Sequence, residues 1–97
     1  MIRIMTADEP ANTTVTVDGK LSGDSVEPVE TCCVQAISKG KPVRLYLRDV
    51  STIDGRGRML LRQLAQKGVA LKASGIYSSY IVDEIQSAEQ NDGHAHR

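Results

Sequence analysis

The chain has 97 residues, of which 40% are hydrophobic and 25% charged, a composition typical of one small globular domain and not of a disordered protein. Twelve basic residues balance twelve acidic ones, and Phe and Trp are absent, so neither a net charge nor base stacking favours nucleic-acid binding. No apolar run approaches the roughly 20 residues of a membrane span, and we expect a cytoplasmic protein.

The N-terminal segment predicts two strands. Residues 2–6 alternate apolar and polar side chains, and residues 13–17 contain only Thr and Val, which favour strands. Segment 8–12 holds Asp, Pro and Asn, which are typical of turns. The short connection predicts an antiparallel hairpin, and Asp18 with Gly19 predicts a turn after it.

A first helix is predicted to begin near Asp24 or Ser25 and to end at about Ser38. Its apolar residues recur at the spacing of one helical face: Val29, Cys33, Ala36 and Ile37. Cys32 and Cys33 are neighbours that point about 100° apart on a helix. We therefore interpret them as packing residues, because one adjacent pair builds neither a disulfide framework nor a metal site.

A strand, a tight turn and a second helix occupy the middle of the chain. Residues 43–48 alternate apolar and polar side chains, which predicts a strand with one face on the core. Asp54 is placed to cap a helix, accepting from the N–H of Arg56 or Gly57, and Gly68 can close its C-terminus. The apolar face of this helix comprises Leu60, Leu61, Leu64 and Ala65.

The C-terminal part predicts one more strand and one more helix. Residues 69–73 form a short apolar run, and Ser78 or Ser79 could cap the helix that follows. Its apolar face comprises Tyr77, Ile81, Ile85 and Ala88. We predict a single domain over residues 1–89 and a mobile polar tail over residues 90–97.

The predicted order is β-β-α-β-α-β-α, which places the chain in the α/β class. Strands that alternate with helices favour parallel pairing, whereas the N-terminal hairpin is antiparallel. We therefore expect a four-stranded mixed sheet with about three to four helices packed mainly on one face.

The middle of the chain resembles the STAS domains, a family named for sulfate transporters and anti-sigma factor antagonists. The family pattern is a hydrophobic strand, an Ile-Asp pair, two small or hydroxyl residues, a Gly and a helix with a Leu-Leu pair. The corresponding residues are Leu47, Val50, Ile53, Asp54, Gly55, Arg56, Gly57, Leu60 and Leu61. Segments 17–23 and 68–73 are similar to the family's first-helix approach and last core strand, so the resemblance extends from Val15 to Ile85.

One residue departs from the pattern of the regulatory members. The second residue after the Asp is there a Ser or Thr that a kinase phosphorylates, and here it is Arg56. A permanent positive charge replaces a hydroxyl that could gain a phosphate of about two negative charges. Phosphate at this position therefore cannot control the chain. Ser51 and Thr52, just before the turn, are the alternative phosphoacceptors.

The resemblance implies a stand-alone interaction module similar to anti-sigma factor antagonists, with an anti-sigma factor or similar regulator as its partner. Two basic residues at a helix N-terminus also favour an acidic partner surface or a bound anion. We predict a partner-binding surface built from two segments: Ser22, Gly23 and Asp24, with Asp54, Gly55, Arg56, Gly57 and Arg58. The chain could also form a homodimer.

Two alternatives remain open at this stage. Stand-alone STAS domains also occur as accessory subunits of membrane transport systems, and a helix N-terminus could serve a small-molecule or nucleotide sensor. An enzyme is not expected, since no nucleophile, base or carboxylate pair lies at a recognisable spacing. We predict no cofactor and no metal, because His94 and His96 alone make a poor ligand set.

Overall fold

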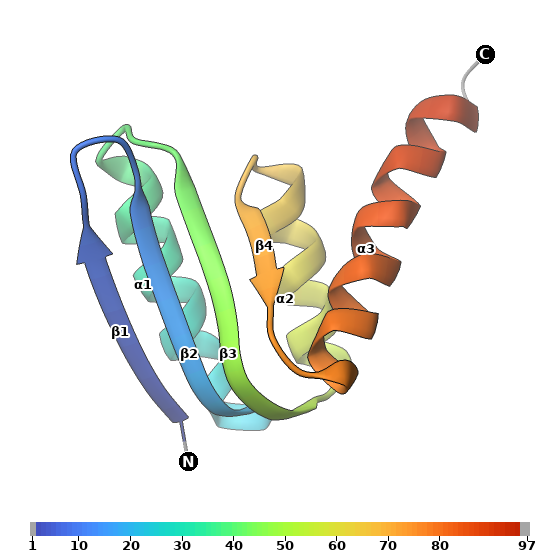
Figure 1. Ribbon diagram of the computed structural model, residues 1–97, viewed down its shortest axis with the longest axis horizontal. Helices are drawn as coiled ribbons and strands as arrows, with labels where there is room; N and C mark the ends of the chain where they lie inside the picture. The colour runs from blue at the N-terminus through green and yellow to red at the C-terminus, as the bar shows by residue number, and fades with distance from the viewer. Residues whose placement is uncertain (1, 96–97) are drawn as a thin grey trace.

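The structure is a computed structural model that describes the backbone of residues 2–95 and the side chains of residues 2–87. Figure 1 shows its elements in chain order. They are β1 (Ile2–Asp8), β2 (Thr13–Leu21), the short 3-10 helix η1 (Gly23–Ser25), α1 (Val26–Ser38), β3 (Val43–Ile53), α2 (Gly55–Gln66), β4 (Ala70–Ala73) and α3 (Ile76–Ala95). The predicted order of strands and helices is confirmed.

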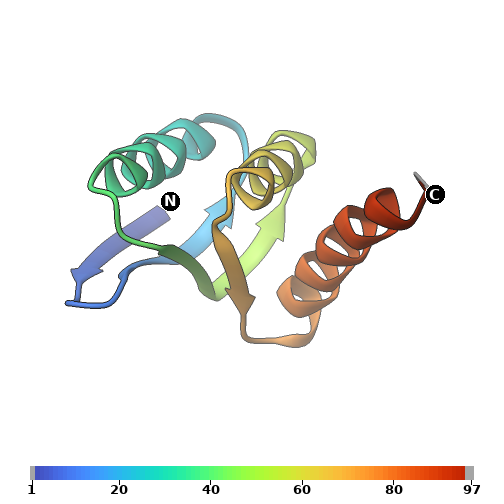
Figure 2. The same ribbon diagram turned by 90° about the horizontal axis from the view of Figure 1, so that it is seen from above.

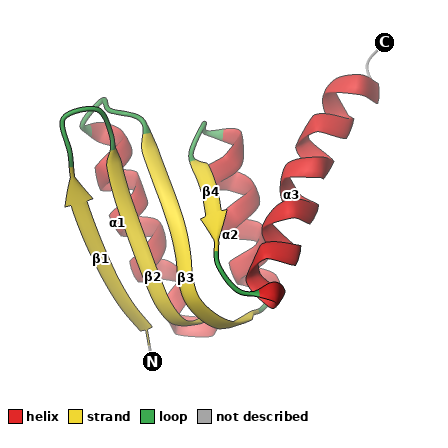
Figure 3. Ribbon diagram, in the orientation of Figure 1, coloured by secondary structure: helices red, strands yellow, loops and turns green. Residues whose placement is uncertain are grey.

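The four strands form one sheet in the order β1-β2-β3-β4 (Figure 3). β1 and β2 are antiparallel, whereas β2 pairs with β3 and β3 with β4 in parallel. The predicted mixed sheet is therefore confirmed, with the N-terminal hairpin supplying its antiparallel part.

Helices α1 and α2 cover one face of the sheet, and α3 lies beside β4 (Figure 2). Alternate residues of β2 and β3 point into the core, as the sequence alternation predicts. The apolar residues of these two strands that are buried under the helices are Val15, Val17, Leu21, Val43, Leu45, Leu47, Val50 and Ile53. The opposite face carries exposed polar groups such as Arg44 and Arg48.

The turn predicted at Asp18 and Gly19 is wrong. β2 continues through both residues to Leu21, with register shifts against β3 around them, and Gly19 has φ 116°. The Asp18 carboxylate accepts from Arg48 Nε at 3.0 Å, which links it to the neighbouring strand. Pairing with β3 therefore overrides the local turn preference, and Asp18-Gly19 becomes an irregularity within the strand.

The N-cap predicted for the third helix is also wrong. α3 begins at Ile76, directly after Gly75 with φ 94°, so Ser78 and Ser79 lie inside its first turn. The buried Ser78 hydroxyl donates to the carbonyl of Val50 at 2.8 Å, and Ser79 Oγ donates to the carbonyl of Ala73 at 3.3 Å. These hydroxyls bond the sheet instead of capping their own helix.

The backbone of α3 continues past Ala88, where the predicted apolar face stops, and reaches Ala95. Residues 96–97 and the side chains from residue 88 onward lie outside the described part, including His94 and His96. The mobility of the segment 90–97 stays a prediction. Among the described residues, no helix combines the length and apolar character that a bilayer span requires.

Candidate functional site at the start of the second helix

Asp54 joins two segments of the chain at the N-terminus of α2. One carboxylate oxygen accepts from the N–H of Gly57 at 2.8 Å, and the other accepts from the N–H of Gly23 at 2.9 Å. The first bond is the predicted N-cap, and the second ties η1 to α2. Hydrogen bonds from Gly57 and then Gly23 hold the pKa of Asp54 below its ordinary value, because both bonds favour the ionised form.

The backbone of Leu21 packs directly against the first turn of α2. Its carbonyl accepts from the N–H of Asp54 at 3.3 Å. A Cβ atom placed on Gly57 would lie 2.4 Å from this carbonyl oxygen and 3.0 Å from Cγ2 of Ile53. Gly57 therefore allows the close approach of β2 and α2, and the corner between η1 and α2 depends on it.

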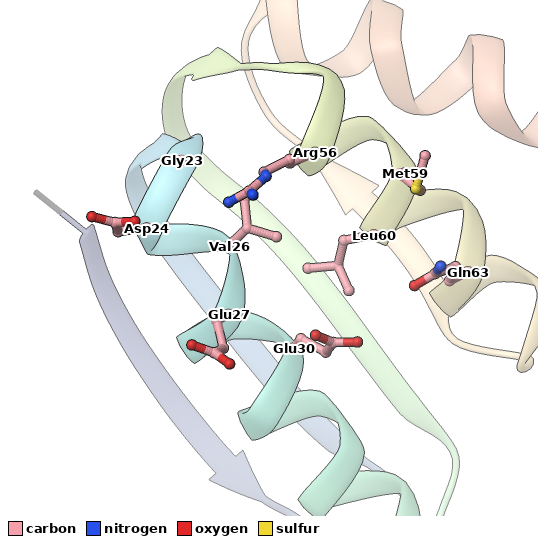
Figure 4. Close-up of a pocket in the computed structure, with 9 residues that line it drawn as sticks. All are labelled: Gly23, Asp24, Val26, Glu27, Glu30, Arg56, Met59, Leu60 and Gln63. Atoms are coloured by element: carbon pink, nitrogen blue, oxygen red, sulfur yellow. The ribbon is translucent and has the colours of Figure 1, made fainter.

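A groove of about 530 Å³ opens between the N-terminal halves of α1 and α2 (Figure 4). Val26 and Leu60 form apolar parts of its lining, and Met59, which is 62% exposed, adds its side chain. Its polar residues are Asp24, Glu27, Glu30, Arg56 and Gln63. We call this surface, completed by Gly23, the α1–α2 groove.

The two arginines of the predicted site have different surroundings. The Arg58 guanidinium forms an ion pair with Glu84 of α3 at 3.0 Å, so part of its charge is neutralised within the chain. Arg56 is exposed and projects across the mouth of the α1–α2 groove toward Gly23 and Val26 (Figure 4). Among the described residues it forms no ion pair, which leaves its charge available to an external group.

The structure brings the two predicted segments together. Gly23 of the first bonds Asp54 of the second, and Asp24 and Arg56 line the same groove. Ser51 and Thr52 lie on the last residues of β3, where both are exposed and neither lines the groove. Both residues are therefore open to solvent, but they lie outside the α1–α2 groove.

Sequence reasoning missed the acidic residues that α1 contributes to the groove and the apolar Met59 of α2. Glu27 and Glu30 stand on the exposed side of the predicted helix, and Met59 is the residue of α2 next to its Leu pair. Helical periodicity alone places these side chains toward solvent. Only the packing of α1 beside α2 shows that they face one another.

Solved structures share the overall fold of this chain. An anti-sigma factor antagonist from Mycobacterium paratuberculosis superposes with a TM-score of 0.77 at 15% identity, over 94% of this chain and 82% of that one. A structure of Mglu superposes with a TM-score of 0.58 at 22% identity, over 74% of this chain but 19% of that one. The chain therefore has the STAS fold that the sequence resemblance predicts.

By sequence alone, no relative of the chain is identified. No known protein-family model matches the chain, and no curated protein matches it. At 15% and 22% identity the structural likeness defines the fold.

Proposed function

We propose that the chain is a protein interaction module that binds a regulatory partner through the α1–α2 groove and the first turn of α2. The observation that carries this proposal is the corner built by Asp54, which fixes Arg56 at the mouth of a groove with apolar surface. The structural likeness to an anti-sigma factor antagonist supports a partner of the anti-sigma factor type.

The groove suits a protein partner because it combines apolar and charged surface. Met59 and the half-buried Val26 offer area that a partner's side chains can bury, and exposed apolar surface rimmed by polar groups is typical of interaction sites. Asp24, Glu27 and Glu30 add charges of one sign beside the single positive charge of Arg56, which would orient a partner with opposite charges.

A protein partner is favoured over a small anion or nucleotide at this helix N-terminus. The Asp54 carboxylate already accepts the N–H of Gly57, one of the donors that a bound anion would use. Three acidic residues that line the same groove also oppose an anion. Arg56 therefore serves better as one contact in a larger interface.

The proposed interaction does not depend on phosphate after Asp54, because that position is Arg56. If phosphorylation regulates the module, the exposed hydroxyls of Ser51 and Thr52 are the nearest candidates. Mass spectrometry of the chain isolated from its host would detect such a modification. A role in the cytoplasm, or beside a membrane transporter, would follow from the partner identified.

The test replaces Arg56 by a photo-crosslinking residue and identifies the cross-linked protein from the host by mass spectrometry. The affinity of that purified partner is then measured for the Arg56→Asp variant. We expect a loss of at least about tenfold, because a charge contact is replaced by repulsion.

Arg62→Asp is the matched control. Arg62 is an exposed arginine on the same helix that does not line the groove, so its reversal changes net charge equally and should leave the affinity unchanged. Equal affinities of wild type and Arg56→Asp would remove the groove from the interface.

A further inference from the structure

The two edges of the sheet differ in their protection. β4 is a short edge strand of four residues, and α3 lies beside it (Figure 1). Gln86 Nε2 donates to the carbonyl of Leu71, and Ser79 Oγ to the carbonyl of Ala73, each at 3.3 Å. Side chains of α3 therefore occupy backbone acceptors of β4 that a further strand would need.

Within residues 2–87, no side chain gives the outer edge of β1 such protection. Among the described residues, β1 pairs only with β2, over seven residues without a register shift. The strand contains no Pro and no Gly, and its two charged residues, Arg3 and Asp8, lie near its two ends. Native edge strands are usually interrupted by charges, prolines or bulges, so this edge can accept another strand.

The hairpin geometry shows which backbone groups point outward. Glu9 N–H donates to the carbonyl of Asn12 at 2.8 Å, so the backbone groups of Glu9 face the second strand. Because the direction alternates along an antiparallel strand, the backbone groups that point to the open edge belong to Ile2, Ile4, Thr6 and Asp8. These residues could donate and accept in a new ladder.

The side chains along this edge carry opposite charges at its two ends. Arg3 lies near the start of β1, Glu9 follows its last residue, and both are exposed. Ile2 and Ile4 pack against the core, so Arg3 points to the face of the sheet that the helices leave open. Glu9 extends the ladder by one residue through its bond to Asn12, and continued alternation would direct its side chain to the same face. Among the described residues neither forms an ion pair, although Arg3 lies opposite Asp18 in the ladder and Lys41 Nζ donates to the carbonyl of Glu9.

A two-fold axis beside Thr6 would bring these charges together. Antiparallel pairing centred on Thr6 places Arg3 of one copy opposite Glu9 of the other, and the symmetry repeats the contact at the far end. In the same register Ile4 of one copy pairs with Asp8 of the other, and the two Thr6 residues pair with each other. Ile4, Thr6 and Asp8 all have outward backbone groups. This register therefore forms backbone hydrogen bonds between the copies and also pairs their opposite charges.

We propose that the occupant of the β1 edge is the β1 edge of a second copy, in an antiparallel, two-fold symmetric dimer. An antiparallel strand edge is complementary to itself, as this symmetry requires. The formal net charge of zero means that two copies do not repel each other at long range. The dimer would join two four-stranded sheets into one and leave both α1–α2 grooves outside the contact.

The test is sedimentation analysis of the full chain over a concentration series, compared with two single variants. Arg3→Glu and Glu9→Lys each place like charges at both proposed contacts, and each should raise the dimer dissociation constant about tenfold. An equimolar mixture of the two variants restores opposite charges at both contacts. It should therefore form a mixed dimer with near wild-type affinity.

Thr6→Pro probes the backbone ladder directly, because it removes an outward N–H at the centre of the edge. We expect it to be monomeric, whereas Thr6→Val, which keeps the N–H, should dimerise like wild type. Circular dichroism verifies folding, and if Thr6→Pro unfolds the charge variants still decide the question. A wild-type chain that is monomeric at millimolar concentration, or a mixture that associates no better than either variant alone, overturns the proposal.

Discussion

Gly57 has the least free space among the glycines at the proposed site. Alanine favours a helix by about 1 kcal/mol over glycine, but overpacking costs about 1–3 kcal/mol. Because the added Cβ would lie 2.4 Å from the carbonyl oxygen of Leu21, we expect the cost to prevail and Gly57→Ala to destabilise the fold by up to about 2 kcal/mol. Urea denaturation measures this loss.

Gly55→Ala is the control for this prediction. Nothing lies within 4 Å of a Cβ at Gly55, two residues earlier in the same turn. Its replacement should leave the free energy of unfolding unchanged or raise it by up to about 1 kcal/mol. Equal effects of the two substitutions would show that the approach of Leu21 does not restrict Gly57.

Cys33 should be far less reactive than Cys32. Cys33 is fully buried in the core, and burial raises the pKa of its thiol to about 12, so almost no thiolate forms at neutral pH. Cys32 is partly exposed. A thiol reagent should modify Cys32 in the native chain and both residues after denaturation. Rapid native modification of both would contradict the packing of α1.

Some contacts of the site could be predicted from the sequence, and others could not. The cap by Asp54 could be predicted, because both partners lie within one helical turn. The bond from Asp54 to Gly23 joins residues 31 apart, and no local pattern specifies a contact at that distance. The ion pair of Arg58 with Glu84 likewise depends on where α3 packs.

At the scale of elements, Tyr77 attaches α3 to the end of β3. Its hydroxyl accepts from the N–H of Ile53 at 3.0 Å and donates to the carbonyl of the same residue at 3.2 Å. Tyr77→Phe removes both bonds without changing the ring, so we expect a loss of about 1–2 kcal/mol in the free energy of unfolding.

Tyr80→Phe tests the specificity of that effect. Tyr80 belongs to the same helix and is 66% exposed, so the loss of its hydroxyl should change stability by less than about 0.5 kcal/mol. Hydrogen exchange at the amide of Ile53 should accelerate in Tyr77→Phe and not in Tyr80→Phe. Unchanged exchange in both variants would contradict the attachment.

The elements that sequence predicted least well are those whose ends are set by other elements. β2 extends through Asp18 because Arg48 and the ladder to β3 hold it. α3 begins at Ile76, directly after Gly75, and the Ser78 hydroxyl bonds Val50 in place of capping the helix. Periodic segments such as Leu60 to Leu64 were predicted well, since their helical signal is contained in the segment itself.

At the scale of the whole molecule, three aspartates link stability to pH. The pKa of Asp8 is lowered by Lys41, that of Asp18 by Arg48 and that of Asp54 by the Gly57 N–H. A carboxyl with a lower pKa in the folded state contributes stability above its unfolded pKa of about 3.9 and loses it as pH falls through the folded value. We expect little change between about pH 7 and 5 and a decline below about pH 4.

The Asp54→Asn variant isolates the contribution of Asp54 to this loss of stability at low pH. The amide oxygen can still accept from the Gly57 N–H. The second, charged oxygen, which accepts from the Gly23 N–H, is lost. The difference in melting temperature between wild type and Asp54→Asn should be constant near neutral pH and shrink below about pH 4. A difference that does not depend on pH would mean that ionised Asp54 adds no stability.

The order of the elements, the mixed sheet and the helix cap were therefore accessible from sequence, because each has a local signal. The α1–α2 groove was not, because it arises where residues of two helices meet. Asp24 and Arg56 were predicted as parts of one partner-binding surface, but the groove that they line follows only from the packing of α1 beside α2.

The cover that α3 places over β4 also limits how far the molecule can associate through its strands. Because α3 obstructs β4, each copy has one edge strand, β1, to which another strand can add. When two copies pair through β1, neither copy has an open edge left. Assembly of this kind stops at a pair and does not extend into fibrils. Loss of α3, by proteolysis or truncation, would remove that limit and turn a closed complex into an open-ended one.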